Sequence, residues 1–129
     1  MFFYRKKKKT DDYNRIKASF FGFFVGDALG VPVEFQSRKS LKNNRVESML
    51  EFGTHYQPAG TWSDDSSMVL ATTDSLITKR KIDYYDIMNN FLKWYKEGEY
   101  TPNGKVFDIG NATSSAAIIK QATSPLLVV

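Results

Sequence analysis

The stretch Gly60-Thr61-Trp62-Ser63-Asp64-Asp65-Ser66-Ser67-Met68 places two adjacent carboxylates at the start of an apolar helical pattern. No Lys or Arg lies within ten residues of this pair on either side. Carboxylates without neighbouring cations favour binding of a hard divalent ion such as Mg²⁺, Mn²⁺ or Ca²⁺. The same side-chain oxygens are also typical of a helix N-cap, which needs no metal. By itself, the stretch leaves a metal site and a helix cap as alternatives.

The spacing of apolar residues predicts an all-helical chain. A first helix is expected over residues 12–29, ended by Gly30, and a second that follows Asp65 and runs to about residue 78. The third begins at its cap Asp83 and stops at Gly98, with Asp86 at its third position. The remaining expected elements are a helix from 111 or 113 to 124 and one short helix near 44–50.

Gly22, Gly26 and Gly30 recur every four residues along one ridge of the first expected helix. Each glycine lowers helix stability by roughly 1 kcal/mol relative to alanine. Three glycines on one ridge of a helix therefore need a structural or functional explanation. Small residues at this spacing allow a neighbouring helix or a ligand to approach closely. We therefore expect this ridge to face a packed neighbour or a ligand.

Length, charge and cysteine content narrow the class of protein. The 129 residues form at most one ordinary domain, 42% apolar and without cysteine, which excludes disulfides and thiolate metal sites. The formal charge of +4 comes from Arg5 to Lys9, and the remaining chain carries 13 basic and 14 acidic side chains. No nucleic-acid surface is therefore predicted. Residues 1–11 are expected to be a disordered basic tail.

The same features predict a cytoplasmic protein, with nuclear import through the basic tail left open. The polar residues after the basic run exclude a secretory signal at that position. The apolar stretch at 20–33 is short and contains Asp27, so no membrane partner is expected.

Three sequence blocks occur in order: GFFVGDALGVPVEF at 22–35, GTWSDDSSM at 60–68 and FDIGNAT at 107–113. Together they resemble the ADP-ribosylglycohydrolase family, including its dinitrogenase reductase-activating type, over about residues 15–117. The resemblance implies an all-helical fold with two Mg²⁺ or Mn²⁺ ions at the mouth of an ADP-ribose cleft. It also implies hydrolysis of the glycosidic bond between ADP-ribose and an acceptor, at the anomeric carbon of the ribose.

The resemblance assigns roles to individual residues. A hydroxyl residue followed by Asp-Asp supplies metal oxygens in the family, and the matching residues here are Ser63, Asp64 and Asp65. Glu34 matches a glutamate beside the metals that gates the site or orients the attacking water, and it is the candidate catalytic residue.

A loop that lines the ADP-ribose site in the family matches Asp108, Ile109, Gly110 and Asn111. The backbone N–H groups of Gly110 and Asn111 are expected to meet pyrophosphate or ribose oxygens. Asp27 either ties down the end of the first helix or supports the metal ligands from behind. The single histidine, His55, lies beside no partner motif, and no role is predicted for it.

The family completes its metal site with a late Asp-x-Asp-Thr/Ser element, whereas this chain has no Asp or Glu after Asp108. We therefore expect residues 12–129 to be the N-terminal part of the domain, with the C-terminal half absent. A complementing C-terminal chain would then be needed, and the chain alone should bind metal weakly and hydrolyse little. A non-catalytic ADP-ribose-binding module and a helical interaction protein are the alternatives.

Overall fold

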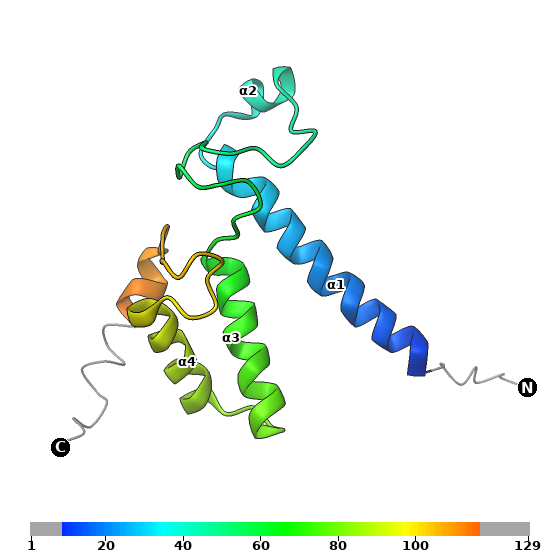
Figure 1. Ribbon diagram of the computed structural model, residues 1–129, viewed down its shortest axis with the longest axis vertical. Coiled ribbons are helices and arrows are strands. Elements are labelled where there is room, and N and C mark those ends of the chain that lie inside the picture. Colours follow the sequence, from blue (N-terminus) through cyan, green and yellow to red (C-terminus); the bar gives the residue numbers. More distant parts are fainter. Residues whose placement is uncertain (1–8, 117–129) are drawn as a thin grey trace, which may run out of the picture.

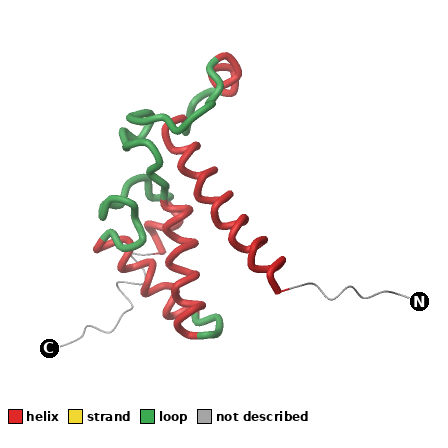
Figure 2. The backbone as a smooth tube through the Cα atoms, turned by 45° about the vertical axis from the view of Figure 1, so that its right-hand side comes forward, coloured by secondary structure: helices red, strands yellow, loops and turns green. Residues whose placement is uncertain are grey.

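The computed structural model describes residues 9–116. Over this range the elements are α1 (Lys9–Gly30), the 3-10 turn η1 (Val31–Val33), α2 (Arg38–Asn43), α3 (Asp64–Lys79), α4 (Tyr84–Glu97) and a helical stretch at 111–116 (Figure 1). No strand occurs among these described residues, as Figure 2 shows, and the all-helical prediction is confirmed.

Helices α3 and α4 run antiparallel and side by side, and they enclose most of the small core (Figures 1 and 2). Ala71 of α3 and Trp94 of α4 are both almost completely buried. Buried Asn90 of α4 donates its side-chain amide to the carbonyl of Ala71 at 3.1 Å, so the two helices are also joined by a polar contact. The packing of α3 on α4 holds the N-terminus of α3 in place.

Local signals set the ends of α4. The Asp83 carboxylate accepts the N–H of Asp86 at 3.1 Å, as the capping pattern predicts. Gly98 closes the helix in the left-handed conformation at φ 72°, with its N–H donated to the carbonyl of Trp94. A Cβ at Gly98 would overlap the carbonyl oxygen of Gly104, so glycine is required there for space as well as for conformation.

Helix α1 packs against α3 only near its C-terminal end, and its N-terminal part stands apart from the other helices (Figures 1 and 2). Ala28 and Val31, at this end, are buried, whereas Tyr13, Ile16 and Phe21 are more than half exposed. By length and composition alone, the segment Asp11–Val33 could cross a membrane. In the structure 17% of this stretch is buried, and the core helix of a soluble protein or a signal sequence passes the same test.

The structure corrects several boundaries. Residues 44–50 are not helical; the short helix is α2, earlier in the chain, because the Ser37 hydroxyl caps it by accepting the N–H of Ser40. Helix α1 already begins at Lys9, inside the expected tail, and residues 1–8 lie outside the described range. The last helix begins at Asn111, and its expected continuation to 124 falls outside the described residues beyond 116.

The expected packing of a neighbouring helix on the glycine ridge of α1 is not found among the described residues, whereas the approach of a ligand stays a prediction. A Cβ added at Gly22, Gly26 or Gly30 would meet no atom within 4 Å outside its own surroundings in the helix. Within residues 9–116, therefore, nothing packs tightly on this ridge.

Candidate functional site

The site begins at the N-terminus of α3, where the two sequence alternatives meet. Ser63 is the N-cap, and its hydroxyl oxygen accepts the N–H of Asp65 at 3.2 Å. The cap interpretation therefore holds for Ser63. The carboxylates of Asp64 and Asp65, in the first turn, remain available for other contacts.

Asp27 reaches from α1 to the start of α3 and fixes it. One carboxylate oxygen accepts the Ser63 hydroxyl at 2.7 Å, and the other accepts the N–H groups of Ser63 at 3.0 Å and Ser66 at 3.1 Å. Two of the N–H groups that a helix start leaves unpaired are thereby satisfied by a charge from another helix. Asp27 thus ties α1 to α3, one of its two predicted roles, and it does so through a predicted metal ligand.

Asp64 connects α3 to the 108–111 loop, since one of its carboxylate oxygens accepts the N–H of Gly110 at 3.3 Å. Burial raises the pKa of Asp64, and the charges of Asp65 and Asp108 raise it further, against the lowering effect of the Gly110 N–H. The Gly110 N–H, which we expected to meet pyrophosphate, is therefore already donated to Asp64. Ile109 is half-buried and Asn111 is exposed.

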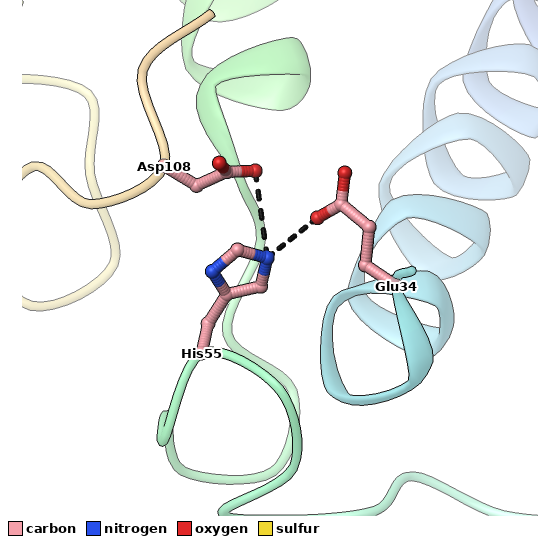
Figure 3. Close-up of side chains that lie close together, drawn as sticks. All are labelled: Glu34, His55 and Asp108. Carbon is pink, nitrogen blue, oxygen red and sulfur yellow. Dashed lines mark hydrogen bonds and ion pairs between the residues drawn. The ribbon is translucent and has the colours of Figure 1, made fainter. Parts of the chain in front are cut away.

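Glu34, His55 and Asp108 converge from three separate segments, as Figure 3 shows. The Nε2 atom of His55 lies 2.6 Å from Glu34 Oε2 and 3.5 Å from Asp108 Oδ2. Burial raises the pKa of Glu34, and the facing Asp108 carboxylate adds to the rise, while the contact with His55 lowers it. The ligand atoms of the three residues all lie within 4.8 Å of one another, so the group could hold a metal ion.

A cavity of about 430 Å³ joins Glu34 to the start of α3. Glu34 lines it together with Asp27, Ser63 and Asp65. The structure therefore brings the predicted catalytic acid and two of the three predicted metal ligands around one space. Asp64, the third predicted ligand, is not among the lining residues, and its carboxylate contacts Gly110 of the 108–111 loop instead.

The family model described as ADP-ribosylglycohydrolase matches residues 8–124. The chain belongs to the ADP-ribosylglycohydrolase family. It is 39% identical over 103 residues to the ADP-ribosylarginine hydrolase Tri1 of Pseudomonas putida (strain GB-1), covering 80% of this chain and 27% of that protein.

Two further relatives are similar. Identity is 33% over 108 residues to the Tri1 ADP-ribosylarginine hydrolase of Serratia proteamaculans (strain 568), covering 84% of this chain and 29% of the relative. Identity is 31% over 108 residues to the ADP-ribosyl-[dinitrogen reductase] glycohydrolase of Rhodospirillum rubrum, covering 77% of this chain and 32% of that relative. The chain thus spans roughly a third or less of the length of these relatives.

For an ADP-ribosylglycohydrolase, the residues at the start of α3 fit a hard divalent ion. Within residues 9–116, neither Asp64 nor Asp65 takes part in an ion pair with a Lys, Arg or His. The hydroxyl of Ser63 accepts one N–H, and a hydroxyl oxygen has a second lone pair to offer. Uncompensated carboxylates beside a hydroxyl are the oxygen donors that Mg²⁺ and Mn²⁺ prefer.

His55 is the residue of this site that sequence reasoning missed. It lies 21 residues from Glu34 and 53 from Asp108, and no local motif marks it. Only the return of the 44–60 segment to the end of α1 brings the ring to its partners. The sequence shows only that His55 is the single histidine of the chain, and this does not indicate a partner.

Proposed function

We propose that this chain supplies the N-terminal part of a Mg²⁺- or Mn²⁺-dependent hydrolase that releases ADP-ribose from arginine. The observation that carries the proposal is the shared cavity lined by Glu34, Ser63 and Asp65. Arginine as the acceptor rests on the names of two relatives, which are ADP-ribosylarginine hydrolases. An ADP-ribosylated protein is then the partner, and the cytoplasm the proposed location.

Ser63, Asp64 and Asp65 are the residues that would hold the metal. When bound there, a divalent ion supplies positive charge that orients ribose hydroxyls and polarises a nearby water. The chain's own contribution is to fix the oxygen donors beforehand. Asp27 holds the Ser63 hydroxyl at 2.7 Å, and the N–H of Gly110 holds one oxygen of Asp64 at 3.3 Å.

Glu34 is the proposed general base. It takes a proton from the water that attacks the anomeric carbon, while the bond between that carbon and the guanidine nitrogen of arginine breaks. The leaving guanidine nitrogen takes up a proton, so the hydroxyl of water ends on ADP-ribose and the proton on arginine. The raised pKa of Glu34, caused first by burial and then by Asp108, makes its ionised form a stronger base than an exposed carboxylate.

We propose that other parts of the family's longer chain complete the site. Mg²⁺ is bound by about six oxygens, and residues 63–65 supply only part of a two-ion shell. The relatives are at least about three times as long as the part that this chain matches. The 129 residues alone should therefore bind metal weakly and hydrolyse little or nothing.

Calorimetric titration with ADP-ribose, in MnCl₂ and in EDTA, tests the proposal. The chain should bind ADP-ribose more tightly in Mn²⁺, and Asp65→Asn should abolish that difference without changing the unfolding midpoint. Asp12→Asn, an exposed carboxylate on α1, is the matched control and should bind as the unmodified chain does. Equal affinity in Mn²⁺ and EDTA would refute the metal role of residues 63–65. Fast turnover of ADP-ribosylated arginine by the chain alone would refute its incompleteness.

A further inference from the structure

His55 occupies the gap between two carboxylates that belong to different parts of the site. Glu34 follows η1 and lines the cavity with Ser63, whereas Asp108 begins the loop that contacts Asp64. Two facing carboxylates repel each other, and a donor between them relieves that repulsion. Figure 3 shows Nε2 of His55 facing both acids, with the second oxygen of Glu34 pointing away from the ring.

The ring of His55 contacts one aromatic neighbour of each acid that it faces. Phe35, next to Glu34, lies 5.9 Å away between ring centroids, and Phe107, next to Asp108, lies 5.6 Å away. The side chain of His55 is only 14% exposed. These ring contacts favour the orientation in which Nε2 faces the carboxylates.

The backbone around His55 is fixed to the same segment as Glu34. Thr54 donates its N–H to the carbonyl of Pro32 at 2.9 Å and its hydroxyl to the carbonyl of Glu34 at 2.8 Å. Gly53 lies so close to Pro32 that a Cβ there would overlap the proline carbonyl. The segment that carries His55 is therefore joined to the segment that carries Glu34 by main-chain contacts, and the contact with Asp108 links both to the 108–111 loop.

We propose that His55 is a positioning residue that couples Glu34 to the 108–111 loop. It holds one oxygen of Glu34, leaves the other for water or substrate, and keeps the loop close to Asp64. The Gly110–Asp64 hydrogen bond is the second link between that loop and the site. This inference rests on the proposed function, because Glu34 acts there as the base and the loop contacts ADP-ribose.

Nitrogen-detected NMR of the imidazole tests the coupling directly, because the chain contains a single histidine and its ring signals need no further assignment. Glu34→Gln and Asp108→Asn should each shift the ring nitrogen and proton signals. Glu51→Gln, an exposed glutamate in the same loop as His55, is the matched control and should leave them unchanged. Ring signals that ignore Glu34→Gln would overturn the proposal, whether or not ADP-ribose binds.

Binding measurements test the positioning role. His55→Ala should weaken Mn²⁺-dependent ADP-ribose binding roughly tenfold, as loss of a supporting partner typically does. His55→Gln retains a donor near the place of Nε2 and should recover most of the affinity. In the Glu34→Gln background, His55→Ala should add little, since it acts through Glu34. Equal losses for the Ala and Gln variants, or additive losses with Glu34→Gln, would overturn the proposal.

Two outcomes distinguish this inference from the proposed function and from a metal-binding role of His55. If the unmodified chain binds no ADP-ribose but its ring signals respond to Glu34→Gln, the proposed function fails and the link between His55 and Glu34 stands. If stoichiometric Zn²⁺, added without ADP-ribose, shifts the ring signals and Mg²⁺ does not, His55 is a metal ligand and the positioning role is refuted.

Discussion

Removing the Asp27 carboxylate tests the contact on which the geometry of the site depends. Asp27→Ala deletes the acceptor of three hydrogen bonds, from the N–H and hydroxyl of Ser63 and the N–H of Ser66. Hydrogen bonds to a charged group contribute about 1.5–3 kcal/mol each, and loss of a helix cap costs about 1 kcal/mol. Because Asp27 is only partly buried, water can replace part of what is lost. We therefore expect the free energy of unfolding to fall by about 3 kcal/mol.

The assay is urea unfolding followed by far-UV circular dichroism. Asp27→Asn keeps one acceptor oxygen without the charge and should lose only about 1 kcal/mol, which keeps the test informative if the alanine variant does not fold. Asp11→Ala, an exposed carboxylate on the same helix, should change stability by less than about 0.5 kcal/mol. A loss below about 1 kcal/mol for Asp27→Ala would show that the hydrogen bonds to Ser63 and Ser66 do not hold α1 to α3.

Three further predictions concern stability. The pKa of Asp64 is raised by burial and by neighbouring carboxylates, so its contribution to stability is full below the unfolded pKa and is lost as pH rises through the folded pKa. In metal-free buffer at neutral pH, Asp64→Asn should therefore be at least as stable to unfolding as the unmodified chain. Any gain in stability should disappear in acid. A less stable Asp64→Asn variant at neutral pH would contradict this prediction. The buried Ser66 hydroxyl has no partner among the described residues, so Ser66→Ala should leave stability unchanged or raise it by up to about 1 kcal/mol in urea titrations. Gly98→Ala should destabilise the chain by more than about 1 kcal/mol, because the backbone there is left-handed and the new Cβ would overlap Gly104. Gly26→Ala lies on an open helical surface and should stabilise the chain by about 0.5–1 kcal/mol. Thermal melts that rank the two variants in the opposite order would refute this prediction.

The sequence alone determined the features whose causes are local. Asp83 and Gly98 mark the ends of α4 because the groups they satisfy lie within four residues of them. The helical class follows from the spacing of apolar residues within single helices, and the family from three short blocks that occur in order along the chain. The sequence places the short helix near 44–50 rather than at α2. The cap of α2, Ser37, is one polar residue in a long polar segment, and such a signal is weak without tertiary context.

Only the tertiary structure decided which residues of the site meet. Asp27 reaches Ser63 across 36 positions, and His55 reaches Asp108 across 53. The sequence named Asp27, Ser63 and Asp108 as candidates through the family resemblance, but it left the partner of Asp27 open and gave His55 no role. Contacts at such separations depend on how α1, the 44–60 segment and α3 pack against one another. Spacing along the chain does not encode that packing, because the contacts of Asp27 with Ser63, and of His55 with Glu34 and Asp108, join segments that no local pattern relates.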